Sequence, residues 1–185
     1  MVSQNLFALE PERQGEYLQR WAELIGVGEA WETLASVRDR VEPHYGAVAR
    51  RIAERLQAHP FTQEVEGIAP IFMAVMPYYF DAPRLDGAYL ENRARAGRAY
   101  LEAGFTASTL AAKYALFVEE WCRVFEALFP EELAWRLELE RALVKVALFN
   151  YAVALEQFSY EREEKFLRAA GISRALLEQM AKVAE

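Results

Sequence analysis

From residue 131 to residue 170 the chain contains neither proline nor glycine, and this uninterrupted stretch most strongly limits what the chain can fold into. Pro130 and two acidic residues precede it, which is typical of the first turn of a helix, where the helix dipole favours negative charge. Gly171 follows it, and glycine is the usual residue just past a helix end. The pattern predicts the longest helix of the chain, from Pro130 to about Ala170.

Prolines and glycines divide the rest of the chain into shorter helical segments. The composition is dominated by Leu, Ala, Glu and Arg, which are good helix formers, and β-branched residues are few. We expect helices over about 11–24, 29–40, 43–58, 70–80, 87–103, 106–129 and 174–183, and a short turn or helix over 61–67. Pro77 should kink or break the segment 70–80. The expected protein is all-α, with one domain over 1–170 and a short C-terminal helix or linker over 171–185.

Charge and targeting signals exclude several functions. The net charge is −7 and basic residues alternate with acidic ones, so a nucleic-acid partner is not expected. The first residues lack the basic and apolar regions of a signal peptide. The longest apolar stretch, 142–155, is broken by Lys145 and Asn150 and is too short to span a bilayer. We therefore expect a cytoplasmic protein without a membrane segment.

Few residues are available for catalysis or metal binding. The chain has two histidines, His44 and His59, and one cysteine, Cys122. A zinc cluster of cysteines and histidines, a paired Glu-x-x-His di-iron motif and a glycine-rich phosphate loop are all absent from the sequence. We expect Cys122 to be a small buried apolar residue. The chain is therefore expected to be neither an enzyme nor a metalloprotein.

The segment 142–155 is apolar almost all round, which predicts a helix buried on more than one side. In a chain of this length, we expect the second side to be another subunit. The sequence thus predicts a homodimer through the last two long helices. The expected interface residues are Val146, Phe149, Asn150 and Val153.

The stretch from Leu90 to Tyr114 carries a family resemblance. Arg95, Gly97, Gly104 and Tyr114 match, in order and spacing, the proximal-helix motif of globin-coupled sensors and protoglobins, which it resembles. Similar matches are the helix end Leu56-Gln57-Ala58-His59-Pro60, the aromatic run Tyr78-Tyr79-Phe80 and the long final helix. The likeness extends from the N-terminal helix to about Phe166. It implies a globin-like fold with an extra N-terminal helix, and a dimeric four-helix bundle formed by the long C-terminal helices.

The resemblance also implies two departures from a haem site. The proximal histidine of that family falls on Tyr100, and its distal tyrosine falls on Ala53. Some relatives in this family, such as the N-terminal domains of stressosome sensors, lack haem and act as dimers that pass a signal on. By this likeness we expect a haem-free, dimeric signalling or interaction module, with a possible partner protein in trans.

Two alternatives remain open from the sequence. The first is a haem sensor with Tyr100 or His44 as the axial ligand. The second is a pocket for another apolar ligand. Under each reading the former haem pocket is formed by the same residues, which are Ala53, Phe72, Met73, Met76, Tyr79, Tyr100, Phe105, Tyr114 and Phe117.

Overall fold

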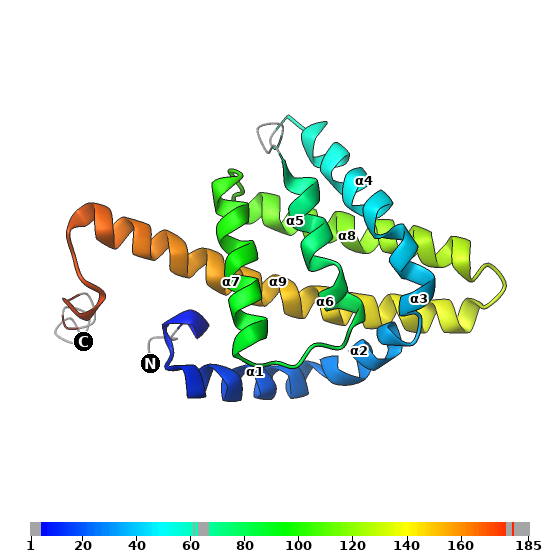
Figure 1. The fold of residues 1–185 in the computed structure, drawn as a ribbon, viewed down its shortest axis with the longest axis horizontal. Coiled ribbons are helices and arrows are strands. Elements are labelled where there is room, and N and C mark those ends of the chain that lie inside the picture. Colours follow the sequence, from blue (N-terminus) through cyan, green and yellow to red (C-terminus); the bar gives the residue numbers. More distant parts are fainter. Residues whose placement is uncertain (1–4, 61, 63–66, 177–178, 180–185) are drawn as a thin grey trace.

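The computed structural model describes residues 5–60, 62, 67–176 and 179, and every regular element within these residues is a helix (Figure 1). The first half of the chain forms η1 (Leu6–Ala8), α1 (Pro11–Ile25), α2 (Val27–Ala35), α3 (Arg38–Val41), η2 (Glu42–His44) and α4 (Tyr45–Gln57). The second half forms α5 (Ile68–Val75), α6 (Pro77–Phe80), α7 (Gly87–Glu102), α8 (Ala107–Leu128) and α9 (Leu133–Ala170). The all-α prediction is confirmed for this part of the chain.

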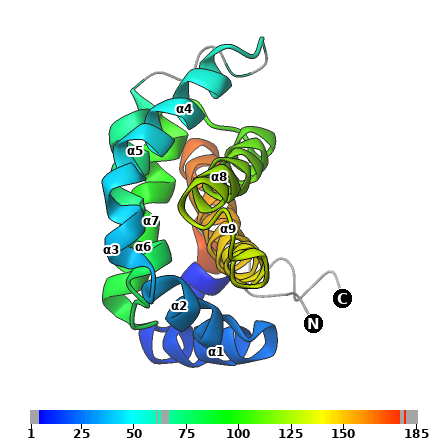
Figure 2. The ribbon, with the colours of Figure 1, turned by 90° about the vertical axis from the view of Figure 1, so that its right-hand side faces the viewer.

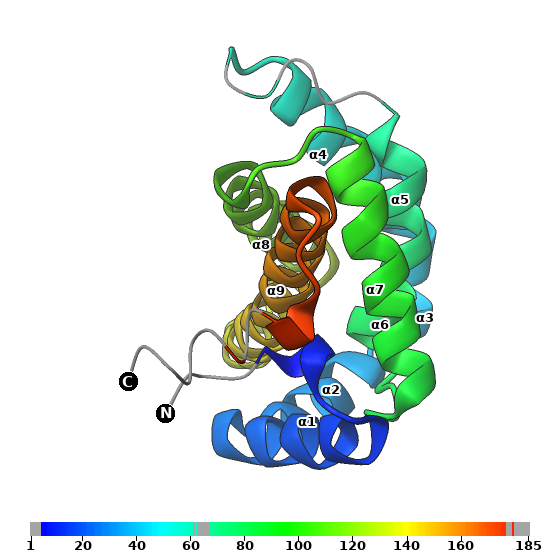
Figure 3. The same cartoon turned by 90° about the vertical axis from the view of Figure 1, so that its left-hand side faces the viewer.

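The helices form two layers around one apolar core. α8 and α9 lie side by side, and α4, α5, α6 and α7 cross over one face of this pair (Figure 2). α1 and α2 lie along the edge of the pair, next to α9 and α7 (Figure 3). No helix of the described residues covers the opposite face of α8 and α9, and the C-terminal end of α9 projects beyond the rest of the molecule.

Local chemistry explains most of the helix boundaries. The Asp86 side chain accepts hydrogen bonds from the first free amides of α7, and Thr106 does the same for α8. Gly171 ends α9 in the left-handed conformation, with φ of 68°. Pro77 breaks the segment 70–80 into α5 and α6, as expected.

Several expected boundaries were wrong. α9 begins at Leu133, because the chain first turns after Phe129. The second expected helix instead begins at Val27, includes Gly28 and ends at Ala35. Residues 174–176 are helical and capped by the Ser173 hydroxyl, whereas most of the expected segments 61–67 and 177–183 lies outside the described residues.

Gly97 brings α7 and α9 into close contact. A Cβ atom at this position would lie 2.6 Å from Cγ of Gln157 on α9, which is closer than van der Waals contact allows. Glycine therefore sets the distance between these two helices. The Tyr100 position lies one turn further along α7 and faces the core.

The expected dimer-interface residues are buried within the single chain. Val146, Phe149, Asn150 and Val153 are all 0% exposed. Trp31 of α2 packs against Phe149 with ring centroids 5.5 Å apart, and side chains of α7 bond to Asn150. The apolar segment is thus covered on several sides by helices of its own chain, and these four residues cannot form the predicted interface.

None of the helices in the described part of the chain is both long enough and apolar enough to cross a membrane.

Candidate functional site

The expected pocket residues form a closed aromatic cluster between α5, α6, α7 and α8. The Tyr100 ring lies 5.0 Å from that of Phe105 and 6.1 Å from that of Phe72. On the other side of the cluster, the rings of Tyr79 and Phe117 are 4.2 Å apart. These centroid distances are those of aromatic rings in direct contact. The structure therefore brings the predicted residues together, but packs them against one another.

Two of the predicted pocket residues, Ala53 and Met73, differ in their burial. Ala53 lies on the inner face of α4 and is buried, as a distal pocket position should be. Met73 was wrongly expected in the pocket, because it is 41% exposed. Phe72 and Met76 are four residues apart and share the inner face of the segment, whereas the Met73 sulfur faces Gly46 on α4.

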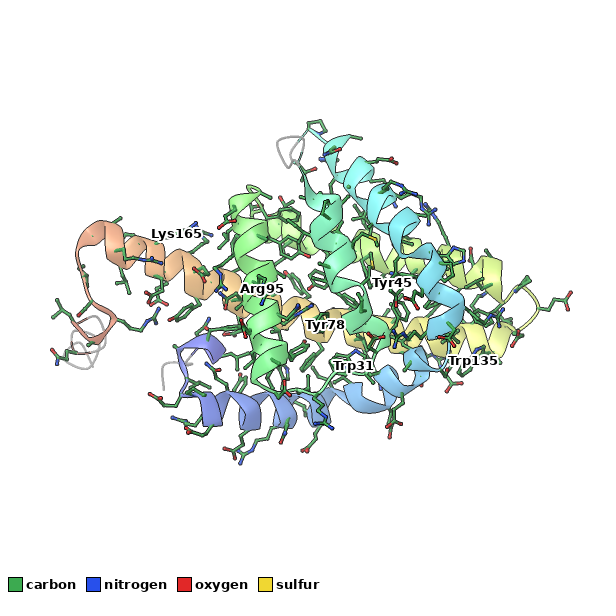
Figure 4. All side chains as sticks on the ribbon, viewed as in Figure 1. Trp31, Tyr45, Tyr78, Arg95, Trp135 and Lys165 are labelled. Carbon is green, nitrogen blue, oxygen red and sulfur yellow. The ribbon has the colours of Figure 1, made fainter. Side chains whose placement is uncertain are left out.

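The Tyr100 hydroxyl is buried and has no hydrogen-bond partner among the residues that the structure describes. Burial raises the pKa of this hydroxyl well above its ordinary value, and the nearby Tyr114 adds to the increase while Arg93 opposes it. Tyr100 therefore keeps its proton at neutral pH. The two arginines closest in the motif do not reach it: Arg95 is exposed on α7 and pairs with Glu91, and Arg98 pairs with Glu161 (Figure 4).

These features do not fit an axial haem ligand. A tyrosine binds ferric haem as tyrosinate, which the raised pKa of Tyr100 disfavours. The rings around Tyr100 are in contact, which leaves no gap for a porphyrin between them. His44 lies directly before Tyr45, whose ring stacks on Phe80, whereas the described ring neighbours of Tyr100 are Phe72 and Phe105.

Lys113 is the residue of this site that the sequence interpretation missed. Its side chain is 1% exposed, although it carries an amine, and its Nζ lies 3.8 Å from the centre of the Tyr114 ring. Its one described hydrogen bond is to the Tyr79 hydroxyl, at 3.5 Å. Burial lowers the pKa of the amine well below its ordinary value, and the Arg93 charge lowers it further. The sequence did contain a signal, because Lys113 lies between Leu110 and Phe117 on the buried face of α8.

Arg93 connects this cluster to α9. Its guanidinium group is buried, lies 4.6 Å from the centre of the Tyr78 ring, and donates a 3.1 Å hydrogen bond to Oδ1 of Asn150. The Tyr89 hydroxyl donates to the same oxygen, and the Asn150 amide donates to the Val146 carbonyl. Nε of Arg93 has no hydrogen-bond partner within the described part of the chain. Asn150 therefore joins buried polar groups of α7 to the backbone of α9.

A second buried charge on α8, Glu120, lies in a very different setting. Its carboxylate is 0% exposed and forms ion pairs with Arg51 at 2.7 Å, Arg123 at 2.9 Å and Arg55 at 3.1 Å. Arg51 and Arg55 come from α4, so the carboxylate holds α4 against α8. Glu120 is thus a structural ion-pair centre.

A cavity of about 870 Å³ opens to the surface beside the aromatic cluster. It lies between the end of α4 and the beginning of α8. Its lining is partly apolar and partly polar, and includes Arg55, Leu56, His59, Thr62, Thr106 and Thr109. None of the predicted pocket residues lines it. This cavity is therefore separate from the predicted pocket.

Within the described residues, no group of three histidine, cysteine, aspartate or glutamate side chains is placed to hold a metal ion.

Cys122 is half-buried on the outer part of α8, where a fully buried residue was expected. Partial burial and three nearby carboxylates raise the pKa of its thiol to about 11, so it is uncharged at neutral pH.

No protein-family model and no curated protein sequence matches the chain.

Proposed function

We propose that this chain is a sensor-globin domain that acts without haem as a dimeric signalling module. The observation that carries the proposal is an apolar stripe on the uncovered face of α9. Leu137, Val144 and Leu148 are each at least 40% exposed on this helix. Tyr151 and Leu155 continue the stripe and are partly buried.

The spacing of this stripe fits helix-to-helix packing. The positions of Leu137, Val144, Leu148, Tyr151 and Leu155 differ by seven, four, three and four residues, which keeps them on one side of a helix. Exposed apolar stripes of this kind mark interaction surfaces. On the neighbouring α8, Ala111, Ala115, Val118 and Cys122 are exposed or half-buried at the same spacing. The two helices thus present a shared surface of large side chains beside small ones.

A second copy of the chain is the partner that this surface fits best. Two copies related by a two-fold axis would bring the same face together, so that the large side chains of α9 meet the small side chains of α8. The product is a four-helix bundle, as in the proteins that the sequence resembles. The interface uses the outer stripe in place of the four buried residues predicted from the sequence.

The absence of haem is supported by the packing around Tyr100. Its hydroxyl stays protonated, its neighbours are in ring-to-ring contact, and the Lys113 amine lies 5.4 Å from the centre of its ring. A module of this kind passes on a signal through its dimer helices. The projecting end of α9 carries Phe166, which is 68% exposed and suits contact with a partner protein.

The dimer is tested with a surface substitution on the stripe. Leu148 is 58% exposed, so Leu148→Asp should leave the fold intact and place two like charges in the interface. Analytical ultracentrifugation should show a dimer for the wild type and a monomer for Leu148→Asp. Leu24→Asp is the matched control, because Leu24 is 84% exposed on α1 and does not belong to the stripe on α9, so this variant should remain a dimer. A wild-type monomer at micromolar concentration contradicts the proposal.

The haem-free state is tested by titration with hemin. The purified chain should show no Soret absorption, and added hemin should give no saturable one-to-one complex. A tight complex that is lost in Tyr100→Phe, which removes only the hydroxyl, would show that Tyr100 is an axial ligand and would overturn this part of the proposal.

A further inference from the structure

The Lys113 amine lies in a closed chamber of aromatic rings. Its Nζ is within 6 Å of five ring centres, which are those of Phe72, Tyr79, Tyr100, Tyr114 and Phe117. No carboxylate of the described residues forms an ion pair with it. The titratable groups around it are tyrosine hydroxyls and the Arg93 guanidinium. Burial and the Arg93 charge lower the pKa of this amine, which favours its uncharged, nucleophilic form.

The groups around Lys113 favour a negative charge at its position. Among the described residues, the Tyr100 hydroxyl and Nε of Arg93 are buried donors without a hydrogen-bond partner, whereas the Tyr79 hydroxyl bonds to Tyr114 and lies 3.5 Å from Nζ. Buried donors without acceptors are costly, so a site with two of them is incomplete as it stands. The Arg93 charge disfavours an ammonium at position 113 and would favour an anion at the same place.

Only a very small electrophile can reach this amine. The rings around Nζ are in contact with one another, so an aldehyde with a side chain has no room beside it. The surface cavity of about 870 Å³ extends to Thr109, which lies one helical turn before Lys113 on α8. This cavity is the entry point that we assign to a small uncharged molecule.

We infer that Lys113 is a carbamylation site for carbon dioxide. The lone pair of Nζ attacks the carbon atom, an N–C bond forms, and one C=O π bond becomes a lone pair on oxygen. The nitrogen then releases one proton to solvent, which leaves an N-carboxylate on Lys113. One carbon dioxide is taken up and one proton is released, so the step needs no oxidant or reductant.

The new carboxylate supplies the acceptors that the site lacks. Its two oxygens can accept hydrogen bonds from the hydroxyls of Tyr79 and Tyr100, and its charge is opposite to that of Arg93. Arg93 also bonds to Asn150 on α9, so a charge that attracts Arg93 competes with this bond. The consequence for signalling rests on the proposed dimer function, whereas formation of the carbamate does not.

The chemistry is tested on the full chain with ¹³C-labelled bicarbonate at neutral pH. The ¹³C NMR spectrum of the wild type should contain one carbamate signal, and ethylation with a trialkyloxonium salt followed by peptide mass spectrometry should place the added carboxylate on Lys113. Lys113→Met should lose the signal, and the exposed-lysine control Lys145→Met should keep it. Circular dichroism confirms that each variant is folded.

Two results would overturn the inference. The first is the absence of labelled carbamate from a folded wild type, and the second is label found only at Lys145, Lys165, Lys182 or the N-terminal amine. Tyr100→Phe should lower the occupancy several-fold, and unchanged occupancy would overturn the role of Tyr100 as a donor. A dimer with no label at Lys113 overturns this inference alone, whereas a labelled monomer overturns the dimer proposal alone.

Discussion

α8 buries two charged residues, Lys113 and Glu120, which are one heptad apart but have contrasting neighbours. Glu120 is surrounded by three arginines whose side chains reach the solvent, and its carboxylate makes short ion pairs with all of them. Lys113 is enclosed by aromatic rings and has one long hydrogen bond. The same helix therefore carries one buried ionisable group that has strong partners and one that has a single long hydrogen bond.

The difference separates a structural role from a functional one. A buried charge with good partners holds two elements in register, as Glu120 holds α4 against α8. A buried amine without a counter-ion costs stability, and a methionine or leucine would fill the same space without that cost. A chain that keeps such a lysine keeps a reactive group in its core, and this is why we place the functional site at Lys113.

The largest effect is expected from Lys113→Met, which replaces the amine with an apolar side chain of similar length. In buffer free of carbon dioxide, this variant should be more stable than the wild type by about 3 kcal/mol, because the cost of burying the amine disappears. Chemical denaturation monitored by circular dichroism measures the difference. A less stable variant would mean that Lys113 is as well satisfied as Glu120, and the contrast between the two would fail.

The difference in stability between the wild type and Lys113→Met should depend on pH. Burial lowers the pKa of Lys113 in the folded chain, while the unfolded chain keeps the ordinary value of 10.5. Between these two values the unfolded chain binds one more proton, so wild-type stability rises with pH. The stability cost of burying the protonated amine is complete below the pKa of Lys113 in the folded chain and absent above 10.5. The advantage of Lys113→Met should therefore shrink by about 1.4 kcal/mol per pH unit within this window, and a constant difference would contradict the lowered pKa.

A smaller effect of opposite sign is expected at Glu120. Glu120→Gln keeps the volume of the side chain but removes the charge that three arginines share, and should destabilise the fold by about 2 kcal/mol. The arginines are half-exposed and can return to water, which limits the loss. Glu119→Gln is the control, because Glu119 contacts Arg55 and Arg123 at the surface and its loss should leave the midpoint of unfolding nearly unchanged.

The helices were largely predictable because their limits depend on local chemistry. Pro77, Thr106 and Gly171 act on the backbone of their own segment, so the sequence identifies them directly. Local chemistry did not predict which helices pack against α9. The apolar segment 142–155 looked like an interface, but α2 and α7 of the same chain cover it, and this depends on contacts between distant residues.

The site was predicted in part for a similar reason. Helical spacing correctly placed Phe72, Tyr79 and Tyr100 together, because they occupy the inner faces of their helices. Lys113 and Arg93 were missed, since a charged residue on a helix is usually exposed and its burial depends on the packing of neighbouring helices. The raised pKa of Tyr100 also depends on burial, so the ligand chemistry of this residue could not be judged from the sequence.

The smallest expected effect concerns Tyr100, whose hydroxyl is a buried polar group close to Lys113. Tyr100→Phe removes a hydroxyl that has no partner, so in buffer free of carbon dioxide it should leave the stability unchanged or raise it by up to about 1 kcal/mol. Trp31, by contrast, donates a 3.0 Å hydrogen bond from its ring to the Tyr78 carbonyl, and Trp31→Phe should destabilise the fold by at least about 1 kcal/mol. Equilibrium urea denaturation of both variants measures the two effects. A loss of stability in Tyr100→Phe would show that its hydroxyl already has an acceptor, and would then make the chamber around Lys113 complete without a carbamate.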